Sequence, residues 1–176
     1  MSFRVAGPAD AAPIAQLHAA SWQSAYRGIL RDDFLDGPVL ANRRELWRAR
    51  LSPPLARDQI VLVEDHEGQI QGFACAFLDA DPEWGTLLDN LHVLPGLKGR
   101  GLGRRLMSEI AQRVLQHNSC LRLHLWAYEQ NLEARRFYER LGGESTALVN
   151  EPAPDGSHLN AVRYCWPDLS GFASIC

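Results

Sequence analysis

The sequence has few cysteines, no long hydrophobic run and no excess of charge of one sign. Its four cysteines lie far apart and form no CxxC pair: Cys75, Cys120, Cys165 and Cys176. We therefore expect free thiols, without a disulfide framework or a zinc site. No window reaches the roughly 18 apolar residues of a membrane span, and the first residues lack the basic and apolar segments of a secretory signal. These absences predict a cytoplasmic protein with no membrane partner.

The charge balance narrows the classes of partner. Lysine and arginine number 18 against 21 aspartates and glutamates, which gives a formal net charge of −3. This balance argues against nucleic acid as a partner, so any site for an anion must be local. The length of 176 residues and the 46% hydrophobic content are those of one globular unit with a real core. We expect a single domain over residues 1–176.

Hydrophobic periodicity predicts an α/β (α+β) chain in the order β-α-α-β-β-β-α-β-α-β-β. Alternating or continuous apolar runs indicate strands, and four-residue apolar steps indicate helices. Gly68 marks a hairpin turn, and Asn131 is a typical helix N-cap. The expected strands cover 3–5, 59–64, 69–77, 86–93, 121–126, 144–149 and 160–166, and the expected helices lie within 10–22, 41–51, 102–117 and 131–142.

The most informative segment, 93–105, joins a strand end, a glycine-rich loop and a helix start. Residues 90–108 contain no acid, and the segment carries four cations: Lys98, Arg100, Arg104 and Arg105. Glycines let a backbone approach a ligand closely, and the first N–H groups of a helix are unpaired at the positive end of its dipole. The segment predicts a cradle for a pyrophosphate. The alternative is a helix-start turn in which the glycines only permit tight packing.

The spacing of the glycines excludes the two common nucleotide motifs. A dinucleotide fingerprint needs GxGxxG, but the glycine after Gly99 and Gly101 is Gly103, one position early. A Walker A loop needs GxxxxGK, which the segment lacks.

Two motifs resemble one known family. Lys98-x-x-Gly101-x-Gly103, after a strand ending in Val93-x-Pro95, is similar to the coenzyme A pyrophosphate loop of the GNAT superfamily of acetyltransferases. That family usually has Gln or Arg at the first position; Lys98 keeps the charge but loses the planar fork of arginine. The family's next motif resembles the run Leu123-x-Leu125-x(5)-Asn131-x-x-Ala134-x-x-Phe137-Tyr138-x-x-x-Gly142. Together the motifs cover about residues 86–143.

The resemblance implies a mixed, mostly antiparallel sheet of six to seven strands, flanked by about four helices and splayed open at the cofactor site. It implies acetyl-CoA as co-substrate and no metal. Backbone groups of 91–93 would pair with the acetyl carbonyl and pantetheine, and amides of 99–104 would hold the pyrophosphate. The implied cofactor residues are Leu91, His92, Val93, Lys98, Gly99, Arg100, Gly101, Leu102, Gly103, Arg104, Asn131 and Tyr138.

Acetyl transfer to an amine needs a proton donor for the departing thiolate. Tyr138 matches the family's frequent tyrosine and is the expected donor. The alternative is that Tyr138, like its neighbour Phe137, is a core residue of an amphipathic helix.

The reaction also needs a base, since an alkyl ammonium with a pKa of about 10.4 is charged at neutral pH. We expect Asp89 in this role, because its two-residue spacing places it on the same strand face as Leu91 and Val93. His92 is an alternative on the opposite face. A water relay from Asp79, Asp81 or Glu83 is a third option.

The family builds its acceptor pocket from its first two helices, which suggests Trp22, Tyr26 and Arg27 as substrate-binding residues. Acids follow at 32, 33 and 36, where an acidic rim would suit a cationic amine. The alternative is that Trp22 is core, Tyr26 packs on it and the acids form a solvated loop.

The leading hypothesis is direct transfer of acetyl from acetyl-CoA to a primary amine of a small molecule in a ternary complex. The alternatives are a protein or peptide amino-group acetyltransferase and a CoA-binding domain without catalysis. Acetyl-CoA and an amine are the implied partners, and a homodimer is left open.

Overall fold

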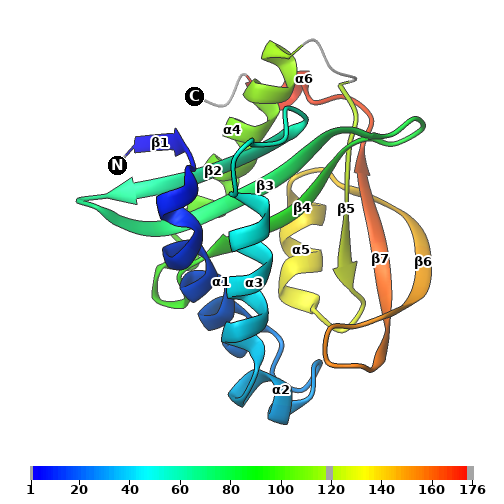
Figure 1. Ribbon diagram of the computed structural model, residues 1–176. Helices are drawn as coiled ribbons and strands as arrows, with labels where there is room; N and C mark the ends of the chain where they lie inside the picture. The colour runs from blue at the N-terminus through cyan, green and yellow to red at the C-terminus, as the bar shows by residue number, and fades with distance from the viewer. Residues whose placement is uncertain (1, 118–120, 174–176) are drawn as a thin grey trace.

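The computed structural model describes residues 2–117 and 121–173, which form one seven-stranded sheet with helices on both faces (Figure 1). Two 3₁₀ turns, Pro8–Asp10 and Pro95–Leu97, precede α1 and α4. The strands are β1 (Ser2–Val5), β2 (Gln59–His66), β3 (Gln69–Asp81), β4 (Gly85–Val93), β5 (Leu123–Tyr128), β6 (Glu144–Pro152) and β7 (His158–Trp166). The helices are α1 (Ala11–Ala25), α2 (Asp32–Asp36), α3 (Val39–Arg50), α4 (Leu102–Gln116), α5 (Leu132–Arg140) and α6 (Ser170–Ala173).

The sheet has the order β1-β2-β3-β4-β5-β7-β6. Neighbouring strands are antiparallel except β4 and β5, which run parallel. The parallel pair joins four antiparallel strands, β1 to β4, to a second antiparallel unit, and the crossover between them carries α4. The mixed, mostly antiparallel sheet expected from the sequence is therefore confirmed.

Separate apolar clusters hold the helices on the two faces. Leu106, Ile110 and Val114 of α4 are fully buried against one face. On the other face, Ile14 of α1 and Trp47 of α3 pack against β2 and β3. A third cluster joins the end of α1, α2 and the start of α3 to the β6–β7 connection. Figure 1 shows α1 and α3 crossing the face opposite α4.

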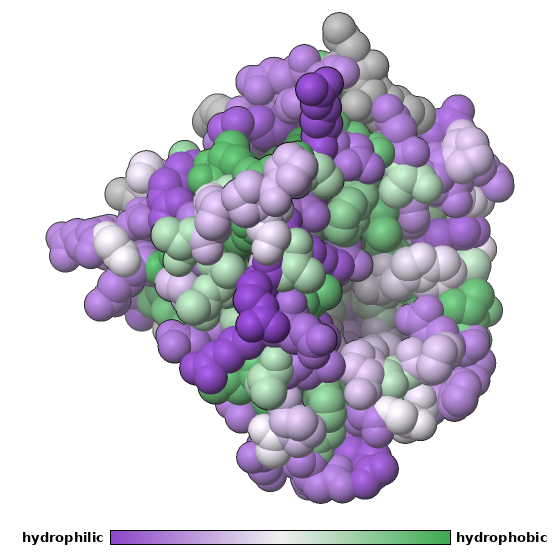
Figure 2. Space-filling view, in the orientation of Figure 1, coloured by the Kyte–Doolittle hydropathy of each residue, from purple (hydrophilic) through white to green (hydrophobic). Residues whose placement is uncertain are grey.

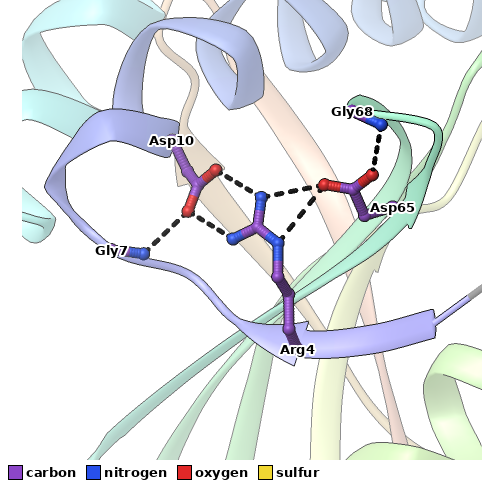
Figure 3. A network of polar contacts seen from close by, with 5 residues as sticks. All are labelled: Arg4, Gly7, Asp10, Asp65 and Gly68. Atoms are coloured by element: carbon purple, nitrogen blue, oxygen red, sulfur yellow. Dashed lines mark hydrogen bonds and ion pairs between the residues drawn. The ribbon is translucent and has the colours of Figure 1, made fainter.

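Arg4 fixes the edge strand β1 to two other parts of the chain (Figure 3). Its guanidinium donates to both oxygens of Asp10, at 2.7 and 2.8 Å, and to Asp65 at 3.1 Å. Asp10 also accepts from the amide of Gly7, and Asp65 from the amide of Gly68 at 2.8 Å. The bidentate contact with arginine lowers the pKa of Asp10 below its usual range. These contacts tie β1 to the start of α1 and to the β2–β3 hairpin.

Most predicted elements are confirmed, with local differences. The hairpin turns through Glu67 and Gly68, both at positive φ, as the sequence indicated. The strand expected from 121 begins at Leu123, and two short helices, α2 and α6, join the four longer ones. Helices this short lack a long apolar repeat, so periodicity cannot reveal them.

Two remaining expectations concern cysteines and membrane spans. Cys75 and Cys165 are buried free thiols in strands, as predicted; Cys120 and Cys176 lie outside the described residues. Among the residues that the structure describes, no helix is long and apolar enough to cross a membrane.

Candidate active site

The sheet opens between its two parallel strands. β4 and β5 pair only at Thr86–Leu123 and Leu87–His124, whereas β5 pairs with β7 along its full length. Beyond Leu87, the β5 side of strand β4 faces a cavity of about 400 Å³. Leu91, His92 and Val93 line this cavity. The splayed sheet implied by the resemblance is therefore present.

The glycine loop closes one end of the cavity. Gly99 and Gly101 have φ values of +77° and +79°, and Gly101 is the N-cap of α4. A Cβ at either glycine would meet nothing within 4 Å, so these positions require glycine for its backbone conformation. Leu102 and Arg104, in the first turn of α4, also line the cavity. The helix start is thus directed at the space where an anion would lie.

Gly103 has a different role from the other loop glycines. A Cβ there would lie 3.2 Å from Cζ of Phe137, tighter than an ordinary contact. Its lack of a side chain lets α5 approach the start of α4. The packing alternative considered for the loop therefore applies to this one glycine.

The positive charge of the loop is partly neutralised. Lys98 forms an ion pair with Glu133 at 2.9 Å, and Arg105 forms one with the fully buried Glu64 at 3.0 Å. Arg104 lines the cavity, but Arg100 is exposed and lines neither this cavity nor the one described below. A count of charges along the sequence therefore overstates the cations that face the cavity.

Helix α5 supplies another wall of the first cavity. The side-chain oxygen of Asn131 accepts from the amide of Ala134 at 3.2 Å, which caps the helix as predicted. Tyr138 lines the cavity and packs edge-on against Phe137 and Trp166. Burial raises the pKa of Tyr138, so its phenol stays protonated at neutral pH.

A β-bulge in β4 corrects the expected orientation of Asp89. Consecutive residues Cys75 and Ala76 pair with Asn90 and Leu88, so Asp89 is an extra residue in its strand. Arg50 Nη1 lies 2.7 Å from both the Asp89 carboxylate and Asn90 Oδ1. Asp89 therefore faces α3, not the face of Leu91 and Val93.

The same bulge brings Asp89 and His92 to one side of the sheet. His92 packs against His18 and Phe73, and its Nδ1 lies 3.0 Å from the Ser21 hydroxyl. Burial, aided by the charges of Arg43 and Lys98, lowers the pKa of His92 to about 3. The imidazole is neutral at pH 7. The expectation that Asp89 and His92 point to opposite faces is wrong.

A second cavity of about 410 Å³ adjoins the first, and Tyr26, Leu88, Asp89, His92 and Trp126 line both. Its other lining residues come from α1, α3, β4, β6, β7 and the end of β5. Figure 2 shows this face of the molecule hollowed between the α1–α3 side and the β6–β7 side. The two spaces thus form one continuous site around the β4 bulge.

The predicted acceptor residues are only partly brought together. Trp22 and Tyr26 line the second cavity and stack edge-on. Arg27 lines neither cavity, because it is ion-paired with Asp32 and Asp36. Asp79, Asp81 and Glu83 also line neither cavity. Asp81 instead accepts hydrogen bonds from two backbone amides in a turn.

The sequence interpretation missed several residues of the second cavity. Arg43 and Arg50 lie seven residues apart on α3 and share the buried face with Trp47. At that spacing the two arginines share one helix face with the tryptophan, so this pattern in the sequence could have indicated a charged site there. Tyr128 and Glu151 gave none, because only the pairing of β5, β7 and β6 brings them to the site.

Comparison with known proteins decides the family. The family model described as the acetyltransferase (GNAT) family matches residues 18–143. The chain belongs to this family. It is accordingly an acyltransferase, as the resemblance indicated.

Individual relatives agree with this assignment. The chain is 26% identical, over 99% of its length and 98% of the relative's, to an uncharacterized N-acetyltransferase, YuaI, of Bacillus subtilis. It is 32% identical over 44% of its length to a spermine/spermidine N(1)-acetyltransferase of the same species, covering 54% of that protein. The crystal structure of PaiA N-acetyltransferase from Thermoplasma acidophilum, in complex with coenzyme A, has the same fold, with a TM-score of 0.73 at 18% identity over 94% of this chain and 98% of that one.

Proposed function

We propose that this protein transfers the acetyl group of acetyl-CoA directly to a primary amine of a small molecule in a ternary complex. The observation that carries the proposal is the meeting of two cavities at the split between β4 and β5. One is bounded by the glycine loop, and the other by aromatic and charged side chains. Two reactants held in adjoining spaces can react without a covalent enzyme intermediate.

The first cavity suits acetyl-CoA. Amides of 99–104 at the start of α4 are placed to receive the pyrophosphate, with Arg104 beside them. The backbone of 91–93 has no strand partner on its β5 side among the described residues, which suits hydrogen bonds to pantetheine and to the thioester carbonyl. Asn131 would contact the pantetheine arm. Acetyl-CoA supplies the activated acyl group and a thiolate leaving group.

Two residues would move protons. Tyr138, whose raised pKa keeps it protonated, would donate to the departing thiolate. Asp89 lies where the two cavities meet and would accept the proton of the attacking amine. Its ion pair with Arg50 holds the carboxylate in place. His92, neutral and bonded to Ser21, would shape the junction instead.

The size and the aromatic lining of the second cavity favour a small acceptor over a protein amino group. Four aromatic rings line it, those of Trp22, Tyr26, Trp126 and Tyr128, and Tyr26 packs edge-on against Tyr128. Elements far apart in the sequence thus wall a space of small-molecule size. The polyamine acetyltransferase among the relatives also acts on a small amine, according to its name.

Titration calorimetry with acetyl-CoA, followed by a thiol-release assay over a panel of small amines and peptides, tests the proposal. We expect binding of acetyl-CoA and thiol release with at least one small amine. Release with peptides alone would favour the protein acetyltransferase alternative. Binding without release from any acceptor would favour a CoA-binding domain.

A further inference from the structure

The second cavity contains a buried arginine without an acidic partner. Arg43 is only 8% exposed, and its guanidinium lies over the ring of Trp22, 4.1 Å from the ring centre. Its hydrogen bonds go to the neutral side chain of Asn42. Within the described residues, no carboxylate forms an ion pair with it. Burying a cation without a counter-charge is costly, so this arrangement needs an explanation.

The other charges of the cavity do not supply that counter-charge. Asp89 attracts Arg43, but it is ion-paired with Arg50, whose like charge acts on Arg43 more strongly in the opposite direction. Glu151 lines the cavity from β6, and it makes no ion pair in the part of the chain that the structure describes. Counting only ion pairs between described residues, the cavity therefore offers one cation without such a pair, Arg43, and one anion without one, Glu151.

We propose that the acceptor is a small amine that also carries a carboxylate, an amino-acid-like zwitterion, and that Arg43 binds this carboxylate. The inference rests on the proposed function and narrows its substrate class. The planar fork of arginine matches a carboxylate with two parallel hydrogen bonds. Asn42 Oδ1 accepts from Nε and Nη2, and Trp22 lies beneath the guanidinium, so the group is held in one orientation. Among the described residues, the edge left for the carboxylate is that of Nη1 and Nη2.

The same charges select against other amines. A polyamine would bring a second positive charge toward Arg43. Glu151 is the acid in the cavity that could neutralise this charge. A zwitterion satisfies Arg43 with its carboxylate, while Glu151 attracts its ammonium group into the cavity. A monoamine without a carboxylate would leave Arg43 buried and unpaired.

The test in the wild-type enzyme compares matched acceptors. α- and ω-amino acids are each paired with their own carboxamides, and putrescine and spermidine are added as carboxylate-free amines. We expect kcat/KM for the preferred acid to exceed that of its carboxamide by about 10- to 100-fold, the effect of one charge-assisted bidentate contact. An aminophosphonate in the panel distinguishes a carboxylate site from a general anion site.

Arg43→Gln and Arg44→Gln form a matched pair of variants. Both remove one positive charge from α3, but Arg44 is exposed and lines neither cavity. Arg43→Gln should abolish the preference, so that kcat/KM for the acid and kcat/KM for its carboxamide become nearly equal. Arg44→Gln should leave the preference for the acid intact. Arg43→Lys, which keeps the charge, serves as a second variant if Arg43→Gln does not fold, and should restore part of the preference.

The outcomes separate this inference from the proposed function. Thiol release with polyamines or carboxamides at rates equal to the acids would overturn the inference and leave the acetyltransferase proposal standing. A preference for acids that survives in Arg43→Gln would also overturn it, as would a preference for the aminophosphonate over every carboxylate. If acetyl-CoA does not bind the wild-type enzyme, the proposed function itself fails.

Discussion

The two halves of the site are built in different ways. In the half proposed for acetyl-CoA, the cofactor half at residues 85–143, the decisive features are local: glycines at positive φ, a helix N-terminus and an N-cap. In the half proposed for the acceptor, the acceptor half formed by α1 and α3 with β6 and β7, side chains from elements far apart in the sequence meet. The cofactor half presents backbone groups, whereas the acceptor half presents aromatic rings and charges.

This difference suggests how one fold can serve many acceptors. Backbone groups recognise a ligand whatever the neighbouring side chains are, so the cofactor half can stay constant. Single substitutions can change which acceptor fits the other half. Asp89 lies at the border, where a bulge in a strand of the cofactor half turns one side chain into the acceptor half.

The largest effect is expected at this border. Asp89→Asn keeps the shape but removes the charge, and should lower kcat/KM by about 10²- to 10⁴-fold if Asp89 is the base. The residual activity should rise with pH, because spontaneous ionisation of the amine replaces the carboxylate. Rates measured from pH 6 to 9 check both points.

Asp36→Asn is the matched control, since Asp36 is also paired with an arginine but lies outside both cavities. It should leave kcat/KM unchanged. A pH profile of wild-type shape in Asp89→Asn, with normal acetyl-CoA affinity, would move the base to another group.

Tyr138→Phe tests the cofactor half through a side chain. Only the hydroxyl is lost and the ring still packs, so kcat should fall by about 10- to 100-fold with little change in acetyl-CoA affinity. Steady-state kinetics and titration calorimetry measure the two effects separately. In the control, Tyr164→Phe, the lost hydroxyl hydrogen-bonds to Glu139 outside the cavities, and kcat should not change. Equal turnover of Tyr138→Phe and wild type from pH 6 to 9 would remove Tyr138 from the mechanism.

Gly101→Ala tests the backbone character of the cofactor half. The residue has φ of +79° and open space around it, so alanine would be strained without a clash. A strain of about 1–2 kcal/mol should weaken acetyl-CoA binding by roughly tenfold as the loop relaxes. Calorimetry gives the affinity. Gly156→Ala, in the β6–β7 turn at φ +83°, carries the same strain and should bind acetyl-CoA normally. Equal losses in both variants would contradict a specific role for the loop.

The smallest effect concerns stability and pH on the acceptor side. Burial lowers the pKa of His18 and, to about 3, that of His92, whereas an unfolded histidine titrates near 6.5. Below about pH 6.5 the unfolded state therefore binds protons that the folded state does not, and the free energy of unfolding falls as the pH falls. Urea unfolding at pH 7, 6 and 5 measures the slope. His92→Phe should make it shallower, and replacement of the exposed His158 by Gln should not. An unchanged slope in His92→Phe would show that His92 takes up its proton over the same pH range in the folded and unfolded protein.

An element could be predicted from the sequence when the interactions that form it are local in the chain. The glycine loop, the N-cap at Asn131 and the amphipathic face of α4 are encoded within a few residues, and each was predictable. The five-residue α2 was not, because it is held by tertiary packing of Phe34 and Leu35 and not by an apolar repeat. The bulge at Asp89 also gave no signal, since alternation in a sequence assumes an unbroken strand.

The sequence by itself determined the family and the cofactor loop, because positive-φ glycines and a helix start are local backbone requirements. It also determined the order of the strands and the four longer helices along the chain, since apolar periodicity reflects which face of each element is buried. Only the tertiary structure decided which charges face the site: it turned Asp89 toward Arg50, drew Arg27 and Arg105 into ion pairs elsewhere, and left Arg43 buried without a carboxylate. The physical reason is that the pairing of a charge depends on distances between elements far apart in the chain, and the order of residues does not contain those distances.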